Sequence, residues 1–267
     1  SDNGGIFEET RFTEGYTAEE IEKFGESMSK DWWPEQKTLP PGVSFGFTGG
    51  TSWDVGDGKM GFLLGGGYKN EWERNVYERT YFLAGAGGDV EAAHTYVFDD
   101  TTHEVLLSGM AAWGWEINDD HEVRVTSMVL RGTEDEARWY QGYNRDAGTE
   151  LRLSRLRWQE RMLVFNQVVG EHDFGPLSFD WRYSYAVATG LEPDRRTTRY
   201  DWVPQQDAWQ ASDRPSAAQR FFSTTIDKAH NVGGDFKIPL VGRNANGQRP
   251  KVYPFIKTGG MFLSKNR

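Results

Sequence analysis

The chain has 267 residues, 14% aromatic side chains, no cysteine and a formal net charge of −10. The missing cysteine excludes disulfides and thiolate metal sites. The acidic balance argues against a nucleic-acid partner, because phosphate binding needs clustered Lys and Arg.

The first 42 residues are polar and irregular, and we expect them to form a long loop with one short helix. Thr17 followed by Glu19 and Glu20 is the pattern of an N-capped helix with carboxylates in its first turn. Prolines soon after this segment break regular structure. The pair Trp32-Trp33 is either a sugar-stacking platform or a packed loop anchor, and we favour the anchor.

From residue 43 onward, apolar residues alternate with small or polar ones, which is the period of a half-buried β-strand. In 177–187, for example, Leu177, Phe179 and Trp181 share one side, while Ser178 and Asp180 share the other. The same pattern predicts strands over 43–53, 59–72, 104–117, 151–170, 219–240 and 251–264, with another through Val123 and Val125. The pattern predicts an all-β fold of about eight long antiparallel strands.

The apolar phase slips between Val125 and Met128, and again around Leu163 to Phe165. A slip of one residue exchanges the two faces of a strand, so we expect β-bulges at both places.

The connections between the strands alternate in length. Short turns are predicted near 54–59, 117–121, 172–176 and 241–250, and long polar connections near 73–92, 132–149 and 189–217. Short turns on one rim and long loops on the other are the layout of an outer-membrane barrel. No stretch of about 18 apolar residues offers a transmembrane helix, but a barrel strand needs only about 9–11 residues of alternating polarity.

Aromatic residues suit the two membrane interfaces, where an amphipathic ring is favoured. The candidates are Trp53, Trp72, Trp113, Trp115, Trp181 and Tyr185. The small and charged residues on the other face suit a watery lumen, since Asp180 and Arg182 would be costly to bury without partners.

Residues 132–199 carry motifs beyond the pattern. They are Gly132-Thr133-Glu134-Asp135-Glu136-Ala137-Arg138, Leu153-Ser154-Arg155-Leu156-Arg157-Trp158-Gln159-Glu160-Arg161, Gly170-Glu171-His172, Asp180-Trp181 and Glu192-Pro193-Asp194-Arg195. In order and spacing they resemble the barrel of TonB-dependent receptors, well over 104–199 and loosely over 43–267.

The resemblance implies energised uptake of a scarce ligand (an iron chelate, a vitamin or an oligosaccharide) across the outer membrane of a Gram-negative bacterium. It implies a barrel of roughly 22 strands, with a plug inside it through which the TonB complex acts. We find no plug segment, so we expect residues 1–42 to be an extracellular loop and 43–267 to be a partial barrel with long extracellular loops. Outer-membrane lipid and a small-molecule ligand are the implied partners.

The sequence offers few sites for chemistry. Glu134, Asp135 and Glu136 are either a cation or ligand site or, as we favour, a solvated acidic loop. Asp180 and Glu160 are an improbable glycosidase pair, because lumen charges are common. The turn 54–59 lacks the ligand series of a calcium loop, and the glycine run 85–88 lacks the helix of a phosphate loop.

The five histidines show no metal-ligand spacing, although His121 and His172 fall in two short turns, which suggests rim positions. We therefore predict no catalytic, metal or cofactor residues and no enzyme activity, and we assign no ligand-contact residue.

Two other function classes remain open. A soluble β-rich carbohydrate-binding or hydrolytic module predicts two packed sheets of shorter strands. A complete small outer-membrane barrel, acting as an adhesin or pore, predicts that the first and last strands pair.

Overall fold

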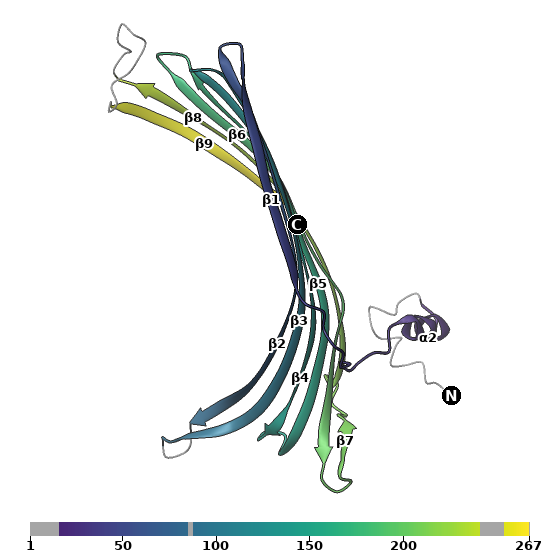
Figure 1. The fold of residues 1–267 in the computed structure, drawn as a ribbon. Coiled ribbons are helices and arrows are strands. Elements are labelled where there is room, and N and C mark those ends of the chain that lie inside the picture. The colour runs from purple at the N-terminus through teal and green to yellow at the C-terminus, as the bar shows by residue number, and fades with distance from the viewer. Residues whose placement is uncertain (1–15, 85–87, 241–253, 267) are drawn as a thin grey trace.

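The computed structural model describes residues 16–84, 88–240 and 254–266. They form one helix and a single antiparallel sheet of nine strands (Figure 1). The elements are α2 (Ala18–Ser27), β1 (Val43–Val55), β2 (Gly58–Ala84), β3 (Val90–Asn118), β4 (His121–Asn144), β5 (Thr149–Asp173), β6 (Ser178–Val203), β7 (Ala208–Ala211), β8 (Ala218–Pro239) and β9 (Phe255–Asn266).

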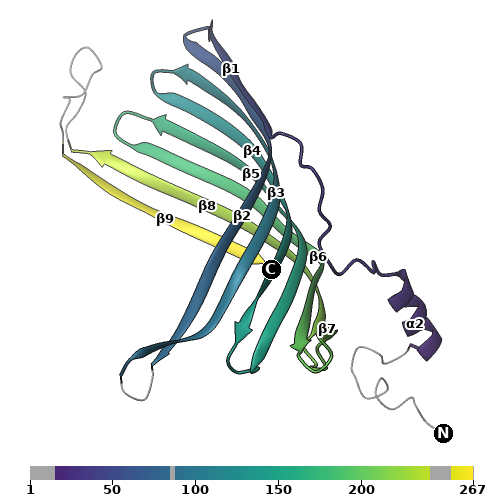
Figure 2. The ribbon, with the colours of Figure 1, turned by 60° about the horizontal axis from the view of Figure 1, so that its bottom comes forward.

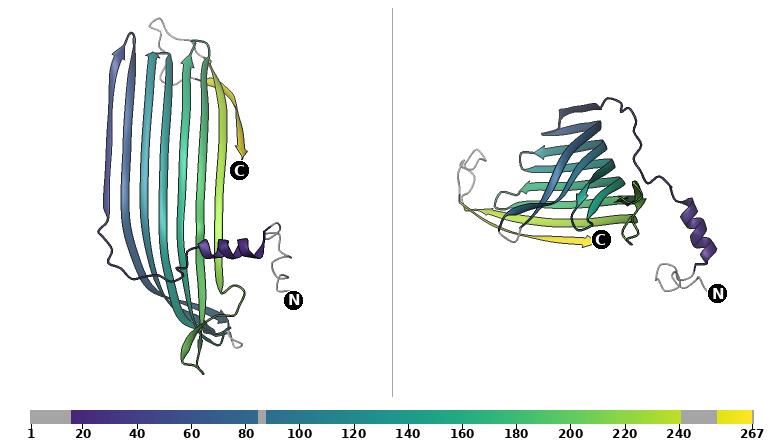
Figure 3. Two further views of the ribbon diagram at one scale, coloured as in Figure 1. Left: turned by 90° about the vertical axis from the view of Figure 1, so that its right-hand side faces the viewer. Right: turned by 90° about the horizontal axis from the view of Figure 1, so that it is seen from below.

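The strands follow one another across the sheet in the order β1-β2-β3-β4-β5-β6-β8-β9, and the short β7 pairs with β6 (Figure 3). The predicted all-β fold with about eight long strands is therefore confirmed. In the described part of the chain the sheet is open, with β1 and β9 at its two edges (Figure 2). It is also one layer, so the two packed sheets of a sandwich are not formed there.

The short turns are confirmed where the structure describes them. β1 and β2 meet at a hairpin of two residues, with Gly56 at φ +61°, and this supports a plain turn over a calcium loop. β3 and β4 join at 119–120, and β5 and β6 at 174–177. The predicted turn at 241–250 and most of the glycine run 85–88 lie outside the described residues.

The long polar connections are wrong as predicted, because most of their residues continue the strands. β2 extends to Ala84, β4 to Asn144 and β6 to Val203, and β3 alone has 29 residues. In these parts both faces carry polar side chains, so the apolar alternation that marks a strand is missing. We call the strand segments 71–84, 90–104, 132–144, 149–160 and 191–203 the polar extension.

The two predicted β-bulges are also wrong. β4 and β5 pair without interruption from His121↔His172 to Asn144↔Thr149. The apolar phase changes because both faces of these strands carry apolar side chains at Met128 to Leu130, and the register does not slip. Irregularities lie elsewhere, for example between Leu156 and Glu160 on β5 and next to Asp194 on β6, which has φ +92°.

The sheet bows along its strands, and the segment before β1 lies with α2 on the convex side (Figure 1). Trp33 contacts Tyr200, and the Trp32 carbonyl accepts a hydrogen bond from Ser154 Oγ at 2.8 Å, so these partners belong to the convex face. Cross-strand partners point to the same side and successive residues to opposite sides. The pairing register therefore tells, for every strand of the sheet, which residues face the convex side and which face the concave side.

An apolar band covers the convex face from the short turns to about the middle of the strands. Its members are Met60, Phe62, Leu64, Ala111, Trp113, Trp115, Val123, Val125, Val129, Met162, Val164, Val168, Trp181, Tyr183, Tyr185 and Val187. The ion pair Arg131–Glu160 on the same face marks its end. The concave face at the same level carries many small residues, such as Gly61, Gly65 and Ser184.

The sheet has almost no interior. The protein exposes 18628 Å², whereas a compact monomer of 30.4 kDa exposes about 11,800 Å². Many large apolar side chains among the described residues, including Phe47, Leu107 and Val232, are exposed. A single layer of this size needs another environment or partner to cover its apolar surface.

The predicted short helix is confirmed as α2. Thr17 accepts a hydrogen bond from the Glu20 backbone N–H while the Glu20 carboxylate accepts one from the Thr17 N–H, which is a complete capping box. The hydrogen bond from the Thr17 backbone lowers the pKa of Glu20. No helix among the described residues is long and apolar enough to cross a membrane.

Candidate functional site

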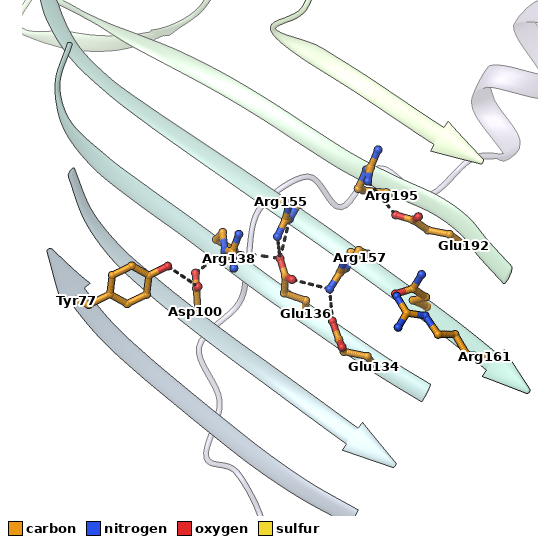
Figure 4. A network of polar contacts seen from close by, with 11 residues as sticks. Tyr77, Asp100, Glu134, Glu136, Arg138, Arg155, Arg157, Arg161, Glu192 and Arg195 are labelled. Atoms are coloured by element: carbon orange, nitrogen blue, oxygen red, sulfur yellow. Dashed lines mark hydrogen bonds and ion pairs between the residues drawn. The ribbon is translucent and has the colours of Figure 1, made fainter. Parts of the chain in front are cut away.

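The strongest concentration of polar contacts lies on the concave face of the polar extension (Figure 4). At its centre is Glu136 on β4, whose side chain is only 5% exposed. Its carboxylate accepts hydrogen bonds from Arg155 Nε at 2.7 Å and from Arg157 at 2.9 Å, both on β5. Arg157 also contacts Glu134. Hydrogen bonds between a guanidinium and a carboxylate are shorter and stronger than those between neutral groups, so these contacts hold β4 and β5 together.

The network continues across β3 to β2. Arg138 Nε donates to Asp100 at 2.7 Å, and the Tyr77 hydroxyl donates to the other oxygen of Asp100 at 3.0 Å. Arg138 also lies 3.8 Å from Glu136, so the two halves are linked. With Arg155, Arg157 and Glu134 included, three cations face three carboxylates, and the network is neutral as a unit. It ties four neighbouring strands together above the apolar band.

Aromatic side chains adjoin this network further from the apolar band. Phe98 stacks on Tyr77 at 5.0 Å and on Tyr140 at 4.5 Å, and Tyr96 meets Phe98 and Tyr140 edge to face. Burial raises the pKa of Tyr140, and burial together with the Asp100 contact raises the pKa of Tyr77. These rings form the small core of the molecule with Leu151.

A hollow of about 840 Å³ opens between the network and the rings. Its lining includes Arg79, Arg138, Arg155, Arg195 and Tyr140. Arg79 lies over the rings of Tyr77 and Phe98 at 5.6 and 5.4 Å. Guanidinium groups held over aromatic faces are suited to ligands that combine negative charge with flat or apolar surface. We name this feature the arginine hollow.

The N-terminal segment is fixed on the opposite, convex face. Ser154, 1% exposed, donates to the Trp32 carbonyl and hydrogen-bonds Thr198 at 2.6 Å. Arg220 lies over the Trp32 ring at 4.8 Å, and Arg196 contacts the Asp31 carbonyl. Trp32 is therefore packed against the sheet, as the favoured anchor interpretation predicts, whereas Trp33 is 37% exposed beside Tyr200.

The acidic string 134–136 is not a solvated loop, contrary to our expectation. It lies in the middle of β4, and alternation sends Glu134 and Glu136 to the concave face and Asp135 to the convex face. The signal that was available is the repeated spacing of two: Glu134 and Glu136 on one strand, Arg155 and Arg157 on the next. Like charges at that spacing share a face of a strand.

The remaining carboxylates and histidines that the sequence offered as possible site residues lie in different parts of the sheet. Glu160 lies on the convex face and Asp180 on the concave face, so they do not form a carboxylate pair. His121 and His172 come together at the short-turn rim, with their Nδ1 atoms 3.3 Å apart, and Trp181 Nε1 donates to His172 Nε2 at 3.1 Å. Sequence spacing had not suggested this contact.

In the described part of the chain, no group of three or more histidine or carboxylate side chains is arranged to hold a metal ion. Comparison with known proteins finds no matching family model and no matching curated protein. The geometry of the sheet and its two faces therefore has to support any functional assignment.

Proposed function

We propose that the chain is a section of the barrel wall of an outer-membrane TonB-dependent receptor, which takes up a scarce ligand with energy from the TonB complex. In this proposal the convex face meets lipid and the concave face lines the lumen. The short turns lie on the periplasmic side, and the polar extension reaches outside the cell. The ligand is an iron chelate, a vitamin or an oligosaccharide.

The observation that carries the proposal is one layer of very long strands with an uncovered apolar band on one face. A strand of 29 residues is about 95 Å long at the usual rise per residue, whereas a membrane crossing takes about 9–11 residues. Soluble sheets bury an apolar face against a second layer. Here the band has no such layer in the described residues, and lipid would cover it.

The distribution of side chains along the strands supports the same orientation. Trp113, Trp115 and Trp181 lie at the short-turn end of the apolar band, where an interfacial ring is favoured. The band ends at Arg131–Glu160, and beyond it the strands carry ion pairs on both faces. Charged strands of this kind are stable in water and not in lipid.

The open edges at β1 and β9 agree with a section of a larger wall. A sheet in lipid must close, because each unpaired backbone amide costs several kcal/mol there. Further strands would pair with both edges, as the roughly 22-stranded receptors of this family require. The arginine hollow then faces the outer vestibule of the lumen, where an incoming ligand would first meet the wall.

Cysteine labelling tests the membrane orientation, because the chain has no cysteine of its own. Val125 and Val168 are cross-strand partners on the convex face, and Thr126 and Gln167 are partners one residue away on the concave face. Each is changed singly to Cys in the full-length protein in washed outer membranes. A water-soluble maleimide should label Thr126→Cys and Gln167→Cys, and leave Val125→Cys and Val168→Cys unlabelled until the membrane is dissolved.

Equal labelling of both pairs, or recovery of the protein in the soluble fraction, would refute the membrane assignment and favour a soluble carbohydrate-binding module. Uptake is tested separately by deleting the gene and limiting growth by iron, a vitamin or an oligosaccharide in turn. The deletion should impair growth in one condition, and a protonophore should abolish the difference in uptake. Unchanged uptake in all three conditions would contradict the transport function.

A further inference from the structure

A second hollow lies on the concave face, at the level where the apolar band ends on the other side. It has a volume of about 940 Å³. Its floor is formed by Leu106, Leu130, Leu163 and Ala188, which come from β3, β4, β5 and β6. Leu130 and Leu163 are directly opposite each other in the ladder. We call it the leucine hollow.

Missing side chains make room for this hollow. Gly132 and Gly190 are the two cross-strand neighbours of Arg161 on the concave face. A Cβ at Gly132 would come within 3.0 Å of Leu106 Cδ2, so glycine leaves the leucine exposed at the floor. Leu106 and Leu130 are 38% and 40% exposed. An exposed apolar patch that is surrounded by charged side chains indicates a surface to which a ligand or another polypeptide binds.

The rim of the leucine hollow is charged, and its charges are not equally satisfied. Lys69 contacts Glu104 at 3.2 Å, and Glu134 is bound by Arg157. Arg161 is the exception. Its guanidinium donates to Gln159 at 3.1 Å, and among the described residues no carboxylate lies within ion-pair distance of it. An exposed cation therefore stands directly beside an apolar floor.

We infer that the leucine hollow binds a single-chain amphiphilic carboxylate, with the apolar chain on the leucines and the carboxylate on Arg161. A guanidinium matches a carboxylate with two parallel hydrogen bonds, which a polar neutral ligand cannot reproduce. The volume lies within the range of small-molecule sites. The inference rests on the proposed function in one respect, namely that the concave face is the accessible wall of a lumen.

The test uses the full-length protein in phosphatidylcholine nanodiscs, with octanoate as the anionic probe and octanamide as its uncharged counterpart. Calorimetric titration, corrected with empty discs, should show saturable binding of octanoate at one site. Arg161→Gln should lower the affinity for octanoate at least about tenfold, which is the lower end of the effect of losing a charge-assisted hydrogen bond. The same variant should leave the affinity for octanamide unchanged.

Two further variants separate this site from general effects. Arg182→Gln is the matched control, because Arg182 lies on the adjacent strand β6, outside the lining of the hollow, and pairs with Asp235. It should bind octanoate normally. Gly190→Leu should fill the hollow and abolish binding of both probes. A Cβ there meets only Thr225 Cβ at 3.9 Å, an ordinary contact, so the strand can accept it.

The inference is overturned if octanoate does not bind saturably, if Arg161→Gln binds it as tightly as the wild type, or if Gly190→Leu retains binding. The first result would also be expected if another polypeptide segment covers the leucines. Each of these results leaves the cysteine-labelling pattern unchanged. Failure of the labelling pattern would instead remove the lumen on which the inference rests.

Discussion

Glu136→Gln is the sharpest test of the ionic network, because the change removes one charge and almost no volume. Arg157 would retain Glu134, and Arg138 would retain Asp100, so only Arg155 loses its carboxylate partner. Breaking a fully buried ion pair costs about 3–5 kcal/mol. The Arg155 side chain is 29% exposed, so water replaces part of the interaction and we expect a loss of about 2 kcal/mol.

The assay is urea unfolding of the full-length protein in lipid, followed by tryptophan fluorescence. Glu91→Gln is the matched control, because Glu91 pairs with Arg145 and both side chains are more than half exposed. Its effect should stay within about 0.5 kcal/mol. Adding Arg155→Gln to Glu136→Gln should restore stability, since it removes the unpaired cation. If Glu136→Gln is no more destabilising than Glu91→Gln, the network does not stabilise the extension.

Two more changes probe contacts elsewhere in the sheet. Hydrogen bonds from Arg74 lower the pKa of Asp99 from its ordinary value of 3.8. The Asp99–Arg74 pair therefore stabilises the fold above pH 3.8, and this stabilisation is lost as the pH falls through the lowered pKa. The difference in unfolding free energy between wild type and Asp99→Asn should shrink below pH 3.8. A difference that stays constant with pH would contradict the pairing. Gly170→Ala should destabilise by about 1–3 kcal/mol in urea unfolding, because a Cβ would lie 2.3 Å from Trp181 Nε1, whereas Gly114→Ala meets nothing within 4 Å and should be neutral; equal effects would refute the close approach.

The sequence predicted strands correctly where one face of the strand is apolar and the other is polar. In 177–187 the alternation of Phe179 and Trp181 with Ser178 and Asp180 was sufficient, and β6 contains that segment except for its first residue. The two-residue hairpin at Gly56 and the capping box at Thr17 were also readable, because each depends on residues only a few positions apart.

The candidate site was missed for the opposite reason. In the polar extension both faces are hydrophilic, so no periodic apolar signal marks the strands. What holds them is contact between residues far apart in the chain: Asp100 with Arg138 across 38 positions, and Glu136 with Arg155 across 19. The two-residue spacing of Glu134 and Glu136 was visible in the sequence. Because this segment was predicted to be a loop, the alternation of a strand, which puts both side chains on one face, was not applied to it.

The sequence by itself determined the class of fold, because period-two alternation and turn chemistry act locally and admit only an antiparallel sheet with one apolar face. Tertiary structure alone decided how far the strands run, which cations meet which carboxylates, and where the Trp32 anchor docks, 122 residues from Ser154. Register between strands brings those partners together, and it follows from the turns together with the faces that each strand buries, so it becomes readable only once the extent of every strand is known.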